Sequence, residues 1–210
     1  MGAKILAAML ATAAACAGCA TPERSRTLND PAVPPATLAR QVCSNCHGAD
    51  GNSISPNFPR LAGQQEQYLV AQLTGFRNHH RSDPAGFEYM WGLSRHLRDE
   101  QIRGLADYFS AQKPAAGEPG DSALAARGKD VFEHGVESKG IPACAGCHGA
   151  RGEGNGTFPR LAGQHADYVV KQLVVFQRTD ERPEGAIMKT VAHALTEDNM
   201  EAVAANVQGL

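Results

Sequence analysis

Apolar residues recur at helical spacing along most of this 210-residue chain. In both halves Tyr, Leu or Val, Leu and Phe form one stripe, over residues 68–76 and again over 168–176. The same spacing predicts helices over 121–136, 99–111 and 197–208, whereas the alternation typical of strands is nearly absent. The pattern therefore predicts an all-α fold.

The apolar stripes belong to a module that is written twice. Each copy begins with a helix, passes through Cys-x-x-Cys-His and a Gly/Asn-rich loop, and reaches an identical Phe-Pro-Arg-Leu-Ala-Gly-Gln stretch. A second helix, a polar loop and a C-terminal helix follow, and Thr196 is the expected N-cap of the last one. Residues 113–120, rich in Pro and Gly, suit a linker. We expect an N-terminal domain over 21–112 and a C-terminal domain over 121–210.

The first twenty residues have the character of an export signal. Lys4 supplies the positive start, a short apolar stretch follows, and small residues lead up to Ala20. Residues 1–20 are therefore predicted to be a signal peptide, which would place the mature protein in the periplasm. Ala17-Gly18-Cys19 also suits a lipoprotein signal, so a lipid anchor at Cys19 is the alternative.

Charge is close to balanced, with a formal net charge of −2. Residues 21–112 carry nine charges of each sign, and residues 113–210 carry ten basic and thirteen acidic side chains. Neither half has the basic stripe that nucleic-acid binding requires. The mature chain also lacks an apolar run of 18 residues, so no transmembrane segment is expected.

The two Cys-x-x-Cys-His motifs, Cys43–His47 and Cys144–His148, carry the clearest chemistry. Two thiols at this spacing add across the vinyl groups of one haem, and the following histidine becomes an axial iron ligand. A structural zinc site, a thioredoxin-like redox motif and a disulfide framework explain the pattern less well. Zinc pairs are usually about 15–20 residues apart, and none of the three requires the histidines. We therefore predict two covalently attached haem c groups.

The second axial ligand of each iron is predicted from the repeat. Aligning Leu97 with Leu195 also aligns Met90 with Met188, whereas Met200 aligns with Ile102 and is expected in the core. The rival ligands are histidines that do not align with one another: His79, His80 and His96 in the first half, and His134, His165 and His193 in the second. Surface or supporting roles suit these histidines better.

Histidine–methionine ligation has a functional consequence. Thioether sulfur favours ferrous iron and raises the reduction potential. With both faces of the iron occupied, peroxide or oxygen has no open position to bind. The sequence therefore predicts an electron-transfer protein, with no catalytic residues, rather than an enzyme.

Taken together, the duplicated CxxCHGxxGN, PxLAGQ, Tyr, QLxxF and methionine resemble the dihaem cytochrome c4 family over residues 36–210. The resemblance implies two tandem cytochrome c-like helical domains related by a pseudo-twofold, with the propionate edges of the haems facing each other. It also implies a periplasmic shuttle from a quinol-oxidising cytochrome bc complex to a terminal oxidase. Met90-Trp91-Gly92 departs from the more apolar run common in the family.

The resemblance also implies residue roles around the haems. The carbonyls of Pro59 and Pro159 would accept the Nδ1 proton of the motif histidines, which orients each ring. Arg60 and Arg160 would pair with haem propionates. The alternative function is a cytochrome subunit or electron acceptor of a periplasmic dehydrogenase, for example a sulfide- or alcohol-oxidising enzyme, because such subunits resemble the same fold.

Overall fold

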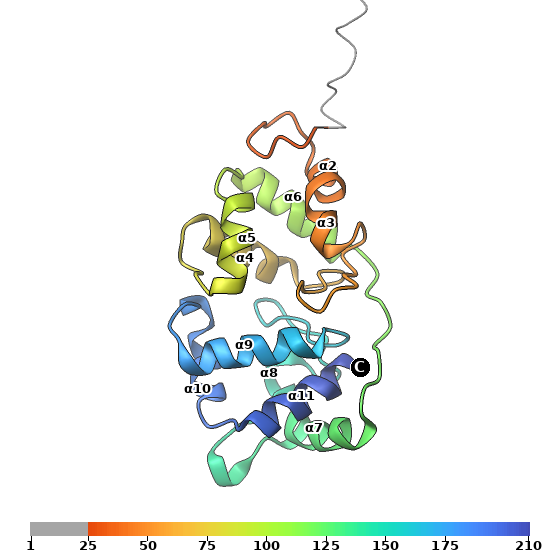
Figure 1. Ribbon diagram of the computed structural model, residues 1–210, viewed down its shortest axis with the longest axis vertical. Coiled ribbons are helices and arrows are strands. Elements are labelled where there is room, and N and C mark those ends of the chain that lie inside the picture. Colours follow the sequence, from red (N-terminus) through yellow and green to blue (C-terminus); the bar gives the residue numbers. More distant parts are fainter. Residues whose placement is uncertain (1–24) are drawn as a thin grey trace, which may run out of the picture.

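A computed structural model of the chain describes residues 25–210, which form two helical domains stacked end to end (Figure 1). The predicted signal peptide 1–20 and the lipidation candidate Cys19 lie outside the described residues. Within 25–210 there is no strand, only two isolated bridges, Val136 with Ile141 and Asn155 with Phe158. The all-α prediction is therefore confirmed.

The first domain starts with one unbroken helical run. This run consists of α2 (Pro35–Leu38), a π-helical turn η3 (Ala39–Cys43) and α3 (Ser44–His47). Gly48 ends it at φ 80°, a left-handed conformation that glycine adopts without strain. The remaining helices are α4 (Glu66–Arg77), α5 (Pro84–Ser94) and α6 (Asp99–Ser110).

The second domain repeats this order with a different entry. Its helices are α7 (Ser122–His134), η4 (Glu137–Lys139), α8 (Ala145–His148), α9 (Ala166–Arg178), η5 (Pro183–Gly185), α10 (Ala186–Ala192) and α11 (Glu197–Gln208). The Asp121 carboxylate accepts a 2.8 Å bond from Leu124 N at the start of α7. Thr196 Oγ1 accepts a 3.2 Å bond from Asn199 N, which confirms the predicted N-cap of α11.

Two local predictions were wrong. The segment before each C-terminal helix, expected as a polar loop, contains α5 in the first domain and η5 with α10 in the second. Pro84 and Pro183 each stand at a first helical position, where the fixed φ of proline favours a helix start. A helix also leads directly into the cysteine motif only in the first domain, because a loop separates α7 from α8.

Each domain has its own hydrophobic core. The buried side chains of the first core come from 33–39, Leu69, Leu97 and α6, and those of the second from α7, Ile141, α9, 192–195 and α11. In both domains the first and last helices cross at a glycine. A Cβ on Gly104 would overlap the Pro35 ring, and one on Gly128 would overlap the Ala202 carbonyl. Glycine therefore permits the close helix contact on which each core is built.

The contact between the domains is reciprocal. Gln64 Oε1 accepts a 2.7 Å bond from Arg160 N, and Gln64 Nε2 donates to Arg160 O at 3.0 Å. Gln164 Oε1 accepts a 2.9 Å bond from Arg60 N, and Gln164 Nε2 donates to Arg60 O at 3.0 Å. Because each residue makes the same contact from both sides, the domains are related by a pseudo-twofold. The twice-repeated Gln of the sequence motif thus builds the interface.

Candidate haem-binding sites

Each cysteine motif forms the last helical turn before a glycine, Gly48 or Gly149, which brings the side chains at positions one and four of the motif to one helix face. His47 and His148 are buried, at 7% and 5% exposure. Pro59 O lies 2.9 Å from His47 Nδ1, and Pro159 O lies 2.9 Å from His148 Nδ1. The structure thus brings the predicted histidine and proline together in both domains with the same geometry.

This geometry sets the protonation of the two histidines. Burial lowers the pKa of His47 and of His148, although the bond to the proline carbonyl opposes this effect in each case. A neutral imidazole that donates from Nδ1 keeps its lone pair on Nε2. That lone pair is what an iron ligand must offer, so both rings are prepared for ligation on one defined nitrogen.

No disulfide joins the four cysteines within residues 25–210. Before any group is attached, burial raises the pKa of the Cys43 and Cys144 thiols to about 11. Zinc ligands and redox-active cysteines are thiolates, which burial in apolar surroundings disfavours. The pairs also belong to separate domains, and no three His, Cys, Asp or Glu side chains within residues 25–210 gather as a metal site. The donor set therefore fits two haem c groups better than one zinc ion.

The candidate distal ligands occupy equivalent helices. Met90 lies on α5 and Met188 on α10, and both are half-buried. Met200 is 2% exposed and Ile102 is 1% exposed, so Met200 belongs to the core as predicted. Aligning the two halves of the sequence with each other therefore distinguished the core methionine, Met200, from Met90 and Met188, the two candidates for iron ligation.

Apolar side chains surround both sites without being covered. Tyr89 and Ile187, which directly precede the two methionines, are 58% and 63% exposed. Phe58 packs edge-on against His47 at 6.2 Å and against Tyr89 at 6.1 Å, and Phe158 packs against His148 at 6.2 Å. Large exposed apolar groups in a cluster indicate a binding surface. Such a surface suits a flat apolar group such as a porphyrin beside each motif histidine.

The rival histidines have other surroundings. His79 packs against Phe87 and Trp91, and the exposed His134 ring lies 3.0 Å from the Asp130 carboxylate. His80, His96 and His193 are exposed. His165 is not a surface residue, because it is buried at the domain interface with Nε2 2.9 Å from Ser53 O.

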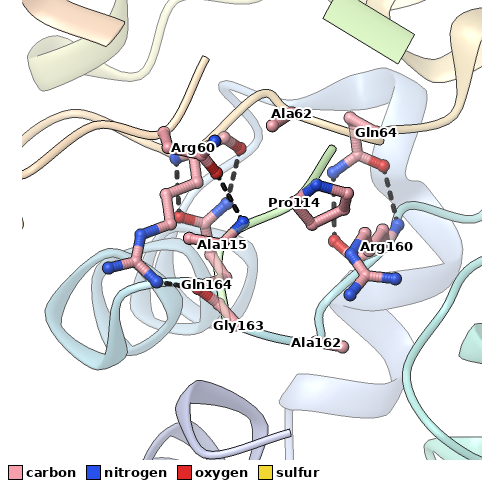
Figure 2. A pocket seen from close by; sticks show the side chains of 10 residues that line it. Arg60, Ala62, Gln64, Pro114, Ala115, Arg160, Ala162, Gly163 and Gln164 are labelled. Carbon is pink, nitrogen blue, oxygen red and sulfur yellow. Dashed lines mark hydrogen bonds between the residues drawn. The ribbon is translucent and has the colours of Figure 1, made fainter. Parts of the chain in front are cut away.

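Arg60 and Arg160 border a small pocket between the domains, closed on one side by Pro114 and Ala115 of the linker (Figure 2). The donors of Arg60 are occupied by protein groups. Arg60 donates to Gly163 O at 2.8 Å and to Ser53 O at 3.3 Å, and it forms an ion pair with Glu118. Arg160 Nε is buried without a partner, and burial lowers the pKa of this guanidinium. A free buried donor suits a carboxylate such as a haem propionate. Arg160 fits that role better than Arg60.

A second set of interface residues was not predicted from the sequence. Arg81 and Arg182 are 4% and 6% exposed and meet the buried Gln72 and Gln172 between the domains. A signal was present, since each half carries an arginine followed two positions later by an acid, Asp83 or Glu184. The equivalence of these two arginines was not recognised, because the number of residues that separates equivalent positions of the two halves changes along the chain.

Fold and sites together define a tandem c-type cytochrome. The Cytochrome c family matches residues 33–113 and 125–210. The chain is 42% identical over 173 residues to cytochrome c4 of Pseudomonas aeruginosa, covering 80% of this chain and 84% of the relative. It resembles the crystal structure of reduced cytochrome c4 from Pseudomonas stutzeri with a TM-score of 0.77 and 38% identity, over 87% of this chain and 99% of that one.

A further relative has a different role. The chain is 37% identical over 179 residues to a thiosulfate dehydrogenase electron acceptor of Thiomonas intermedia, covering 82% of this chain and 79% of the relative. With the two cytochrome c matches and the likeness to cytochrome c4, the assignment is plain: the chain belongs to the dihaem cytochrome c4 family. It is an electron-transport protein that carries two covalent haem c groups.

Proposed function

We propose that this protein is a periplasmic two-haem electron carrier. Cys43 with Cys46 and Cys144 with Cys147 form the thioether links, and the axial pairs are His47 with Met90 and His148 with Met188. The observation that carries this proposal is the pair of 2.9 Å contacts from the histidines to Pro59 O and Pro159 O, equal in two domains joined by a reciprocal interface.

Each part of the site has a task in such a carrier. Haem iron supplies one-electron exchange. The proline carbonyls hold the imidazole planes, which reduces the rearrangement that accompanies a change of charge. Met90 and Met188 would supply the thioether sulfur that fills the remaining iron position, so that the chain would pass electrons and keep substrates off the iron. Arg160, with its free Nε, is the propionate partner.

We further propose that the donor is a quinol-oxidising cytochrome bc complex and the acceptor a terminal oxidase. Electron-transfer partners meet briefly through small interfaces, and the charges of the two halves, balanced in 21–112 and slightly acidic in 113–210, provide no large positive field for docking. No helix within residues 25–210 has the length and apolar character needed to cross a bilayer. Release of the mature chain after Ala20 would leave a soluble protein, and the mass of its N-terminal peptide distinguishes this from lipidation at Cys19.

The second candidate function is electron acceptor of a periplasmic dehydrogenase, and the likeness to the acceptor of thiosulfate dehydrogenase favours it. The two candidates differ in the donor. Stopped-flow reduction of the oxidised protein is to be measured with a cytochrome bc complex and, separately, with a sulfur-compound dehydrogenase. Fast two-electron uptake from the bc complex supports the carrier, and uptake only from the dehydrogenase, or copurification with it, supports the alternative.

Variants separate the role of the iron ligands from general damage. Met90→Ala and Met188→Ala should each remove the weak red absorption of sulfur-ligated ferric haem from one haem and raise peroxidase-like activity there, because one iron position opens. Met200→Leu is the matched control, since Met200 lies in the core and a volume-conserving change is tolerated. Unchanged red absorption in either alanine variant would refute the ligand assignment.

A further inference from the structure

Two arginines lie buried where the domains meet. Arg81 follows α4 and Arg182 follows α9, the two helices that face each other across the interface in Figure 1. Each guanidinium stacks on a phenylalanine of its own domain, Arg81 on Phe76 at 4.4 Å and Arg182 on Phe176 at 4.5 Å. The stacking fixes the plane of each guanidinium and so directs its remaining donors.

The donors of each arginine cross the interface. Arg81 donates to Gln72 Oε1 at 2.7 Å in its own domain and to Gln172 Oε1 at 3.3 Å in the other. Arg182 donates to Gln172 Oε1 at 2.5 Å and to Gln72 Oε1 at 2.7 Å. Two guanidiniums therefore share two glutamine oxygens, and neither domain completes this arrangement alone.

The same arginines anchor the segments that lead to the methionines. Arg81 Nε lies 2.6 Å from Asp83 Oδ1, and Asp83 is the N-cap residue of α5, which carries Met90. Arg182 occupies the N-cap position of η5, which runs directly into α10 and Met188, and its Nε lies 3.0 Å from Glu184 Oε1. The backbones also meet, since Ser82 N donates to Glu181 O at 2.9 Å.

Close packing makes these anchors stiff. A Cβ on Gly86, in the first turn of α5, would lie 3.0 Å from the Phe76 ring, and one on Gly185 would overlap the Phe176 ring. The helix starts thus rest on the same phenylalanines on which the arginines stack. Buried charge-assisted hydrogen bonds hold their geometry tightly, because a lost partner leaves a desolvated charge.

We propose that Arg81 and Arg182 are positioning residues that hold each methionine-bearing segment through the opposite domain. The strength with which Met90 is kept in position then depends on Arg182 of the other domain, and that of Met188 depends on Arg81. This inference rests on the proposed iron ligands. It gives the duplicated fold a physical route by which a change at one iron site alters the other.

The test measures how firmly Met90 is held when only the other domain is altered. The holo-protein with Met188→His keeps both irons six-coordinate and leaves Met90 as the source of the sulfur–iron(III) absorption. Titration with imidazole, which displaces methionine, then gives an apparent dissociation constant for the first haem. Adding Arg182→Met should lower this constant about fivefold or more, within the usual range of coupling between sites. Arg81→Met with Met90→His gives the reverse measurement.

Arg127→Met is the matched control, because Arg127 is an exposed arginine of the second domain that pairs with Asp198. It should leave the imidazole constant of the first haem unchanged. Arg182→Lys provides a second variant in case Arg182→Met loses haem, since lysine keeps the charge but lacks the planar fork whose two nitrogens reach Gln172 and Gln72 separately. An unchanged constant in folded Arg182 variants, or an equal shift with Arg127→Met, would overturn the inference. Absence of the sulfur–iron absorption from Met188→His alone would instead refute the ligation by Met90.

Discussion

The two domains agree in the contacts of the motif histidines and differ in the helices that surround them. His47 and His148 have the same 2.9 Å contact to a proline carbonyl, and the contacts of Gln64 and Gln164 are related by the pseudo-twofold. By contrast, the helical run into the first motif is continuous, whereas a loop precedes the second. Duplication has preserved the ligand geometry and the interface, and the rest of each domain has diverged.

The methionine helices show this divergence most clearly. In the first domain α5 carries Trp91, which packs on Phe87 at 5.8 Å and under Arg95 at 5.0 Å. The second domain replaces this cluster with the shorter α10. The anchoring ion pair differs as well, because the Asp83 side chain is 1% exposed and that of Glu184 is 26% exposed. Met90 is thus the more rigidly supported of the two candidate ligands.

The largest expected effect comes from removing one pair of haem-binding thiols. Replacing Cys43 and Cys46 with Ala, or Cys144 and Cys147 with Ala, should each lower the intact mass by one haem. Each pair serves its own domain, so the other domain should keep its haem. Loss of both haems from either variant would show that the two sites are not independent.

The helix crossings at Gly104 and Gly128 should differ in how strongly an added methyl group destabilises each domain. Gly128→Ala should cost about 3 kcal/mol of unfolding free energy and Gly104→Ala about 1 kcal/mol, the two ends of the usual range for overpacking. The reason is the neighbour, since Gly128 faces a backbone carbonyl and Gly104 faces the half-buried ring of Pro35. Chemical denaturation of each holo-variant measures both values, and equal costs would contradict the distinction.

Replacing Arg60 and replacing Arg160 should have different effects: the first should lower the stability of the protein, and the second should lower the redox potential of one haem. Arg60→Met breaks bonds to Gly163 O and Glu118 and should lower stability by about 1–2 kcal/mol. Arg160→Met removes a positive charge with a free donor, which should lower the potential of one haem by up to about 59 mV, a tenfold change for one electron. Redox titration and denaturation of both variants would show the opposite pattern if the roles were reversed.

The smallest effect concerns acid sensitivity. A 2.7 Å bond from Arg77 lowers the pKa of Asp99 at the start of α6. A carboxylate with a depressed folded pKa adds stability above its unfolded pKa, and this contribution is lost as the pH falls through the folded value. Arg77→Met should return the pKa of Asp99 towards its ordinary value in an NMR titration. Both side chains border solvent, so added salt should reduce the difference.

The sequence predicted helices well where their ends carry a chemical signal. The helix over Glu197–Gln208 has the predicted bounds, because Thr196 caps it and acidic residues fill its first turn. Helices α5 and α10 were missed, since Gly86 and Gly92 interrupt the apolar period of one and the other has only seven residues. Short helices depend on tertiary contacts, which a periodic pattern does not contain.

The candidate sites also combine features that the sequence predicts with features that depend on tertiary contacts. The cysteine motifs and the aligned methionines are visible in the sequence, because covalent attachment and ligation demand particular residue types. The network of Arg81 and Arg182 was not visible, since it depends on two segments of different domains meeting around shared glutamine oxygens. The unequal partners of Arg60 and Arg160 likewise depend on where Glu118 of the linker lies.

The central claim is that each chain carries two haems, both with histidine and methionine on the iron. The most direct test compares the sulfur–iron(III) absorption of the oxidised protein with its haem content, together with a redox titration. We predict two sulfur-ligated haems per chain, both at high potential. A single sulfur-ligated haem per chain, with the other haem at a clearly lower potential, would contradict the claim. A histidine such as His96 on the iron in place of Met90 would give this result.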